Sequence, residues 1–437
     1  MDAAEPRPYG TIEAPARRPA TRLGVWPMLA LAGYWLGISA MWAGLASILS
    51  GRLEFEGMVP RGTEGDALFR MLAAGGLVAI VLQPAVGALS DHTATRWGRR
   101  RPYIAAGALG DLVFLAGIAT SHTVLAIAGF VFALQVSSNT AQGPYQGLVP
   151  DLVPDTQLGS ASGLVGLMTA LGNVAGYLVG AAAIATGRYA AATVGLGLLE
   201  AAAMVALVAS VREPRVALDR GGRSWPAVAR GALGRDVLRE RSFAWLVASR
   251  LAFLAGGAVL TTFAPFYAAR CFGLGPSATG AVIAAVVGMV AVGTLAAVLP
   301  AARLSDRVGR RRVIWAACAV SASGLAVMAV APSVPVAATG AVIFGTGTGA
   351  FLGVDWALLS ELVPLASAGR FMGIANVAAG SAGLLAAAVG GTVMDLVGGA
   401  AASPAGPRAA LAVGALGVVA AALLLRPVRE PGRSAST

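Results

Sequence analysis

Ionisable side chains inside long apolar stretches are the residues of this sequence best placed to do chemistry. Six of them lie within or at the ends of runs rich in Ala, Val, Leu and Gly, namely Asp111, Asp151, Glu200, Arg250, Asp355 and Glu361. A charge in an apolar environment is unstable unless it pairs with an opposite charge, meets water or takes up a proton. The pattern therefore predicts ion pairing and proton binding. Arg250 and Asp355 lie at a similar depth in their runs and are expected to pair.

A polar segment between two apolar runs occurs twice. Both copies read Leu-Ser-Asp followed by Arg-x-Gly-Arg-Arg-Arg, and each is expected on a short loop between helices. An aspartate at a helix end accepts hydrogen bonds from a neighbouring helix N-terminus and from a loop arginine, so the segments are predicted to act as a gating latch. The glycines suit tight turns. The gating candidates are Asp91, Arg96, Gly98, Arg99 and Arg100 in the first copy, and Asp306, Gly309 and Arg310 in the second.

Amide side chains form a stripe along one apolar run. Gln135, Asn139, Gln142 and Gln146 are spaced by four, three and four residues, which places them on one face of a helix. Four amides facing lipid would lose their hydrogen bonds, so the stripe is predicted to line a polar pathway. Aromatic and amide side chains in other runs are further candidates, namely Tyr34, Trp35, Trp42, Asn173, Tyr177, Trp356 and Asn376.

The composition explains which elements position these side chains. Of 437 residues 57% are hydrophobic and 12% are charged, and the mean hydropathy is +0.74. A helix of about 20 apolar residues crosses a bilayer, and unbroken apolar runs rather than alternating ones favour helices over strands. Twelve spans are expected, at 25–50, 67–90, 102–121, 123–150, 159–186, 189–211, 242–270, 276–302, 312–331, 333–363, 369–397 and 406–426.

The distribution of arginine predicts the orientation in the membrane. All 32 basic residues are arginine, and 25 fall in the tails and alternate loops of one side, six fall on the other side, and Arg250 lies within a span. By the positive-inside rule both termini are cytoplasmic in a multi-pass protein of the cell (inner) membrane. The expected organisation is a disordered tail at 1–24, six-helix halves at 25–211 and 242–426, a linker at 212–241 and a tail at 427–437.

The two halves share motifs beyond the polar segments. Leu148–Pro154 and Leu358–Pro364 align at a constant offset of 210, each with an acid three residues before a proline. The paired motifs resemble those of the major facilitator superfamily. This resemblance implies an all-α integral membrane protein with twelve transmembrane helices in two pseudo-symmetric halves. It also implies that substrate binds between the halves and moves by alternating access.

A narrower resemblance lies in the first half. Gln83–Asp91, Thr95–Ile104, Asn139–Pro144 and Gly172–Tyr177 are similar to segments of plant-type sucrose-proton symporters, and Pro144-Tyr145 to glycoside-pentoside-hexuronide cation symporters. The resemblance implies a sugar or glycoside as substrate. Since sugar sites combine aromatic rings with a few polar groups, the amide and aromatic candidates are expected to bind it. Melibiose-type sodium symporters carry acids where this chain has Gln83-Pro84 and Gln142, so proton coupling or uniport is favoured. The sucrose-type pattern has an arginine at the position of Gln146.

The predicted function is secondary active transport of a small polar solute. The expected partners are the solute, protons and the bilayer, with no nucleic acid, no metal and no cofactor, and the protein is expected to be a monomer. Cys271 and Cys318 lack metal-ligand spacing, and no nucleophile-base constellation indicates an enzyme. An exporter of drug-like molecules and a non-transporting receptor or assembly factor stay open as alternatives.

Proton coupling is assigned to the acids of the apolar runs. Asp151 lacks the arginine that the sucrose-type pattern supplies, so it is expected to have no counter-ion when occluded and to carry the proton. The alternative is a hydrated carboxylate at the helix end that serves the gate together with Glu361. Asp355 with Arg250 is expected to be structural. Glu361 is the corresponding acid of the second half and is a further candidate for coupling or gating.

Overall fold

The computed structural model describes residues 22–93, 95–154, 157–211, 213, 240–362, 375 and 379–428. The tail 1–21, residues 214–239 of the predicted linker and the tail 429–437 lie outside the described residues. The described residues form long helices throughout, with these bounds: α1 Val25–Phe55, α2 Glu64–Asp91, α3 Arg101–Thr120, α4 Val124–Leu152, α5 Leu158–Thr186, α6 Tyr189–Ser210, α8 Arg241–Phe272, α9 Pro276–Val308, α10 Arg310–Val330, α11 Val334–Leu362, α13 Ala382–Gly398 and α14 Ala405–Leu424.

The helices follow the apolar runs of the sequence. Among the helices of the described residues, ten are long and apolar enough to cross a membrane, and α13 is a shorter apolar helix. The predicted bounds agree within a few residues for most spans. The start of the span predicted at 369–397 lies largely outside the described residues.

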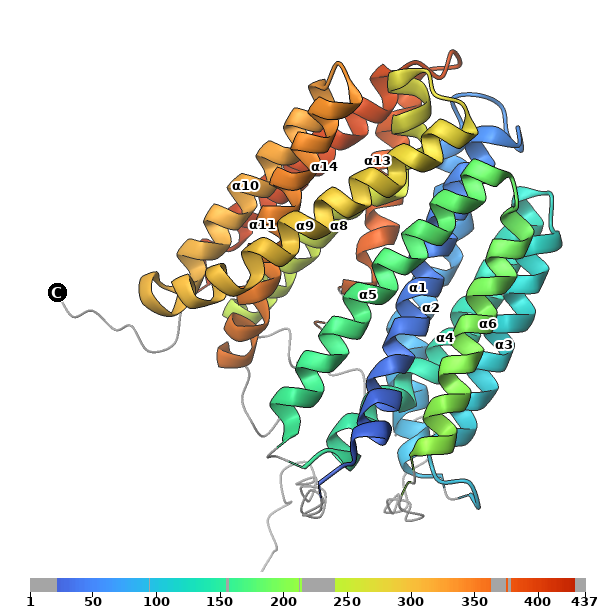
Figure 1. Ribbon diagram of the computed structural model, residues 1–437, viewed down its shortest axis with the longest axis vertical. Coiled ribbons are helices and arrows are strands. Elements are labelled where there is room, and N and C mark those ends of the chain that lie inside the picture. The colour runs from blue at the N-terminus through green and yellow to red at the C-terminus, as the bar shows by residue number, and fades with distance from the viewer. Residues whose placement is uncertain are drawn as a thin grey trace, which may run out of the picture.

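The helices form two groups with the same internal packing. Figure 1 shows α1 to α6 on one side and α8 to α14 on the other. In the first group α2 packs on α4, α3 on α6 and α1 on α6, and in the second α9 packs on α11, α10 on α14 and α8 on α14. Corresponding helices therefore make corresponding contacts, as expected of two pseudo-symmetric six-helix halves.

Small residues let the helices pack closely. On α1 and α5, Gly44 and Gly176 face each other, and a Cβ on Gly176 would lie 2.3 Å from the carbonyl oxygen of Ala40. Helix association in membranes depends on such close approach, because lipid provides no hydrophobic driving force between helices. The pairing of α1 with α5 fixes the side of the first half that faces the second.

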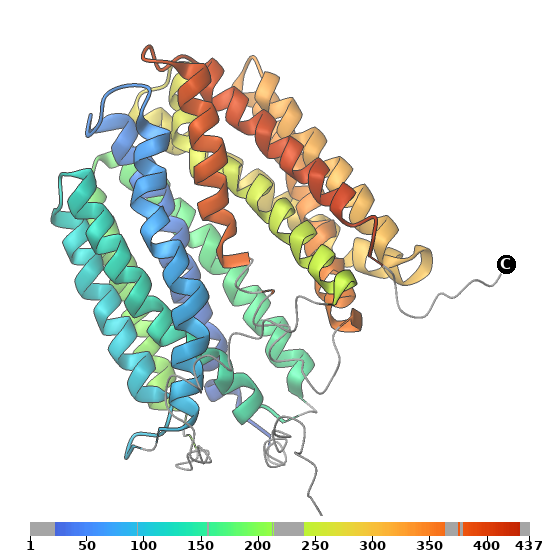
Figure 2. The same cartoon turned by 180° about the vertical axis from the view of Figure 1, so that it is seen from behind.

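The two halves meet at one end and diverge toward the other. Both views show this arrangement, from the front in Figure 1 and from behind in Figure 2. Across the halves α5 packs on α9, α2 on α13 and α1 on α8. We call the meeting end, which holds Glu54, Glu64 and Arg270, the closed end. The opposite end holds Asp91, Arg100 and the start of α10, and we call it the arginine-rich end.

The second polar segment differs from the predicted loop. The helix α9 continues through Asp306 to Val308, and α10 begins at Arg310, so Gly309 alone separates them. The prediction of a loop is wrong here, because this copy is four residues shorter and leaves only a turn. Gly98 and Gly309 have positive φ angles of 114° and 101°, which confirms their predicted role in tight turns.

Candidate functional site

The amide stripe lies on α4. Asn139 is buried, while Gln135, Gln142 and Gln146 are half-buried. Asn139 Nδ2 donates to the carbonyl and side-chain oxygens of Gln135 at 2.7 and 3.0 Å. Gln142 Nε2 donates to Ser138 Oγ at 2.8 Å. The side chains are thus held along one helix, with part of their hydrogen-bonding capacity directed to each other and to α4 itself.

The aromatic residues of α1 do not form one platform. Tyr34 is fully buried inside the first half, its ring lies edge-on to Tyr145 with centroids 4.8 Å apart, and its hydroxyl donates to Glu200 at 3.5 Å. Tyr34 therefore does not face a pathway between the halves in this conformation, and its predicted substrate contact is not supported. Trp35 and Trp42 are partly buried against the apolar cores, and Trp35 lies 5.7 Å from Tyr145.

The candidates on α5 lie nearer the second half. Asn173 is exposed, and Tyr177 is within hydrogen-bonding reach of Thr261 on α8. Tyr177 therefore contributes to the boundary between the halves. The side chains of Trp356 and Glu361, and Asn376 as a whole, lie outside the described residues.

The predicted pair of the second half is confirmed. Arg250 Nη1 of α8 donates to Asp355 Oδ2 of α11, and both side chains are buried. The equal depth expected from the sequence thus brings opposite charges together. Each charge offsets the desolvation of the other.

Asp151 has arginine partners, which contradicts the expectation of a cation-free acid. Arg99 donates to Asp151, and Arg100 lies 3.1 Å from it. Arg100 also donates to Asp91 at 2.7 Å. The sequence did not indicate this pairing. The sucrose-type pattern has its arginine at the position of Gln146 on the same helix, whereas the arginines that contact Asp151 come from the segment before α3.

Within the described ranges, Asp91 and Arg100 of the latch contact residues of the first half and not the second. Arg100 reaches from the start of α3 to Asp91 on α2 and to the carbonyl of Pro144 on α4 at 3.1 Å. A Cβ at Gly147 would lie 0.9 Å from the Arg100 guanidinium, so this glycine leaves the path of the side chain free. The Asp91–Arg100 bond is present although the halves diverge at this end, so it is not confined to a state closed here.

The backbone amides before α3 have a different acceptor from the predicted one. Glu213 Oε2 accepts from the amides of Arg99 and Arg100, each at 2.8 Å. We did not predict Glu213, which lies in the linker as the sequence defined it. Its acidic type among arginines was the only available signal.

The remaining latch residues are Arg96 of the first copy and Asp306 and Arg310 of the second. Arg96 is exposed and lies over the Trp97 ring at 5.9 Å. Asp306 is exposed and has no ion-pair partner within the described ranges, whereas Arg310 is half-buried. Within the part of the chain that the structure describes, Asp306 therefore makes no contact like that of Asp91 with Arg100.

Charged residues missed in the sequence join the halves at the closed end. Arg270 on α8 lies 2.6 Å from Glu54 on α1 and 2.8 Å from Glu64 on α2. Asp395 of α13 accepts from the amides of Gly65 and Asp66 at 3.0 and 2.7 Å, which caps the N-terminus of α2 from the other half.

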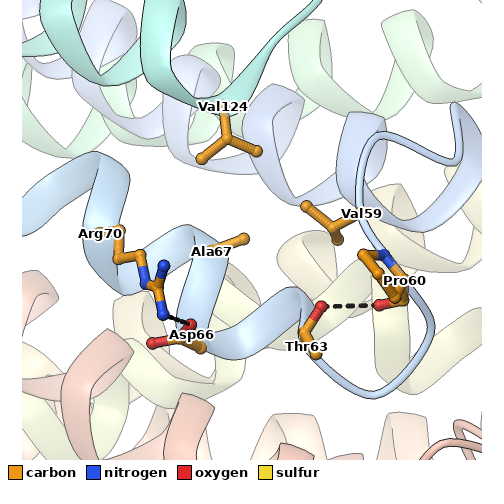
Figure 3. A pocket seen from close by; sticks show the side chains of 7 residues that line it. All are labelled: Val59, Pro60, Thr63, Asp66, Ala67, Arg70 and Val124. Carbon is orange, nitrogen blue, oxygen red and sulfur yellow. Dashed lines mark hydrogen bonds and ion pairs between the residues drawn. The ribbon is translucent and has the colours of Figure 1, made fainter.

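A hollow of about 300 Å³ lies beside the first turns of α2, next to the preceding loop and the start of α4. Figure 3 shows its lining, with Arg70 bonded to Asp66 and Thr63 bonded to Pro60. The other lining residues are Val59, Ala67 and Val124. None of the predicted substrate-binding residues lines this hollow.

Comparison with known sequences gives relatives for part of the chain. The sucrose transport protein SUT4 of Oryza sativa subsp. indica is 31% identical over an alignment of 189 residues that covers 38% of this chain and 30% of that relative. The general alpha-glucoside permease of Schizosaccharomyces pombe is 33% identical over an alignment of 123 residues that covers 24% of this chain and 22% of the permease. The chain thus matches less than a third of the length of these relatives.

Solved structures show the fold over nearly the whole chain. A mutant of the nucleoside transporter NupG superposes with a TM-score of 0.71 at 12% identity, covering 92% of this chain and 99% of the other. A bacterial homolog of the human lysosomal transporter Spinster gives 0.71 at 14% identity, covering 92% and 96%. The sequence model of the Major Facilitator Superfamily matches residues 28–387 and 272–437. The chain therefore belongs to the Major Facilitator Superfamily.

Proposed function

We propose that this protein is a secondary active transporter that moves a sugar or glycoside by alternating access, coupled to protons. Membership of the superfamily supports transport, and similarity to sucrose transport proteins and to an alpha-glucoside permease supports the substrate class. The two-half architecture suits a substrate site between the halves.

The observation that carries the proposal is the amide stripe of α4. Sugar hydroxyls both donate and accept hydrogen bonds, and an amide side chain offers two donors and a carbonyl acceptor. Gln135, Gln142 and Gln146 are half-buried, so each is accessible from the space beside α4. In the proposed site a sugar replaces the contacts that these amides make along the helix, and Tyr177 contributes from α5.

The orientation follows from the arginines. We place the arginine-rich end and both termini on the cytoplasmic side of the cell membrane. The closed end then faces outward, and the contacts of Arg270 and Asp395 close the outer side. Transport in this proposal requires these contacts to break while contacts form at the arginine-rich end, so that each state has its own set of bonds.

Among the acids predicted to couple protons, each described one is paired. Asp355 is bonded to Arg250, and Asp151 to Arg99 and Arg100. We retain Asp151 as a coupling acid because its site is partly open to solvent, with 16% of the side chain exposed. It would take a proton in a state in which the two arginines have moved away.

The test of substrate recognition is counterflow in proteoliposomes. Vesicles loaded with unlabelled sucrose or an alpha-glucoside are diluted into the labelled sugar, and exchange is measured. Asn139→Leu and Gln142→Leu should each abolish saturable exchange while leaving expression and the gel-filtration profile unchanged. Thr140→Val, on the same turn of α4, is the matched control and should exchange normally. Wild-type exchange in both leucine variants would contradict the proposed site.

A further inference from the structure

Two carboxyl groups face each other in the interior of the first half. Asp111 on α3 and Glu200 on α6 are 0% and 1% exposed, and their side chains are within hydrogen-bonding reach of each other. The Oγ of Ser137 donates to Asp111 Oδ1, and the Tyr34 hydroxyl donates to Glu200 Oε1 at 3.5 Å. The four helices α1, α3, α4 and α6 thus enclose the pair.

No cation within the described ranges faces these acids. The arginines of the enclosing helices point elsewhere, because Arg52 donates to the carbonyls of Ile118 and Ser121, and Arg101 donates to that of Val208. Among the described residues, the other titratable group beside the pair is the Tyr34 hydroxyl, and Tyr145, whose ring packs on Tyr34, donates its hydroxyl to the Leu31 carbonyl. Oδ2 of Asp111 and Oε2 of Glu200 are buried without a donor from the described protein.

Close packing limits what can bind between the two carboxyl groups. A Cβ on Gly37 of α1 would lie 2.9 Å from the Glu200 Cα, and one on Gly107 of α3 would lie 2.5 Å from the Ser137 carbonyl oxygen. The helix backbones are therefore in contact around the pair. Two neighbouring carboxylates cannot both stay ionised in such an interior, whereas one proton between them creates an O–H···O bond.

The pair is connected to the amide stripe. Ser138 of α4 is fully buried with its hydroxyl close to the Asp111 carboxyl group, and its Oγ accepts from Gln142 Nε2 at 2.8 Å. A sugar that takes the Gln142 amide removes this donor from Ser138. The Ser138 hydroxyl can then turn toward Asp111 and donate to it, which changes the stability of the proton there.

We propose that Asp111 and Glu200 share a proton and form a proton-binding site that is linked through Ser138 and Gln142 to substrate binding on α4. The link to substrate rests on the proposed function, whereas the proton site itself does not. The pair supplies a proton site in the first half, distinct from Asp151 at the arginine-rich end.

Infrared spectroscopy of the reconstituted protein tests the proton site without any substrate. A protonated carboxyl group has a carbonyl band separate from that of a carboxylate, and the band shifts in D₂O. At neutral pH the wild type should show this band, and the variant Asp111→Asn/Glu200→Gln should lack it. Asp66→Asn is the control, because its side chain is 48% exposed, and it should retain the band.

If the double variant does not fold, the single variants still test the proton site. Asp111→Asn and Glu200→Gln each remove the bond between the two carboxyl groups and should move or remove the band. A band identical to that of the wild type in every variant that folds, single or double, would overturn the proton site.

Transport by the same proteins tests the link to substrate. Under an inward proton gradient the double variant should lose sugar accumulation yet keep counterflow, because Asn and Gln resemble the protonated acids in shape. Accumulation equal to wild type would overturn the link. Accumulation that follows a sodium gradient in the wild type and is lost in the double variant would assign the pair to sodium instead. Absence of counterflow in the wild type would refute the proposed function alone, since the infrared result stands independently.

Discussion

At the residue scale, the Arg250–Asp355 pair shows how this protein keeps charges within its spans. Both side chains are buried, and they come from α8 and α11, so the pair joins two helices inside the second half. The free energy of such a pair is a balance between attraction and desolvation. Loss of one member therefore costs more than loss of both.

We expect Asp355→Ala to destabilise the protein strongly, by about 3–5 kcal/mol, because it leaves Arg250 buried without this carboxylate. The double variant Arg250→Leu/Asp355→Leu removes both charges and should recover most of that stability. Thermal unfolding in detergent, followed by light scattering and tryptophan fluorescence, measures the two. A double variant as unstable as the single one would show that the charges do not act as a pair.

The sequence predicted this pair but not the surroundings of Asp151 and Tyr34. The depth of a residue in a membrane-spanning helix can be estimated from its position in the apolar run. In the second half Arg250 and Asp355 are the cation and the acid that lie at a similar depth within their spans. Asp151 meets arginines that lie 52 and 51 positions away, in a loop whose path depends on how α2, α3 and α4 pack. Tyr34 has a hydroxyl group that could line a pathway. The packing of α1 on α6 instead directs its side chain toward Glu200, inside the first half.

At the element scale, Arg100 connects three helices of the first half. It precedes α3, bonds to Asp91 at the end of α2, and lies 3.1 Å from both the Pro144 carbonyl and Asp151 on α4. The three helices therefore share one cation at the arginine-rich end. The length and position of these helices follow from the apolar runs, but their convergence on one side chain does not.

We expect Arg100→Met to lower the thermal stability of the protein by about 1.5–3 kcal/mol for the charged hydrogen bonds lost. Asp151 would then keep Arg99, and Asp91 would lose its ion pair with Arg100. Arg96→Met is the control, since Arg96 is exposed and contacts the Trp97 ring, and it should unfold as the wild type does. Equal unfolding temperatures for the two variants would contradict the stabilising role of Arg100 between α2, α3 and α4.

At the scale of the whole molecule, the closed end depends on backbone contact between the halves. A Cβ on Gly65 of α2 would lie 2.4 Å from the Gly391 carbonyl oxygen of α13. The Arg270 and Asp395 contacts lie at the same end. Such contacts join residues 206 to 330 positions apart. Local periodicity carries no information about them, so the sequence predicted two halves without predicting which end would be closed.

We expect Gly65→Ala to open the closed end, because the added methyl group cannot fit against the α13 backbone. The native cysteines are first replaced by Cys271→Ser and Cys318→Ser. Spin labels at Ala190→Cys and Ala401→Cys then report the separation of the halves by double electron–electron resonance. Gly65→Ala should move the distances to longer values. Gly383→Ala, which adds its methyl group to open space on α13, should not change them. Identical distributions in both variants and the parent would contradict the closing role.

Accumulation of a sugar driven by a proton gradient is the activity that we propose for this member of the superfamily. Proteoliposomes with an inward proton gradient are supplied with labelled sucrose or an alpha-glucoside, with and without a protonophore. We expect accumulation above the external concentration, and we expect it to collapse when the protonophore is added. Equilibration without accumulation, or accumulation that the protonophore leaves unchanged, would contradict it.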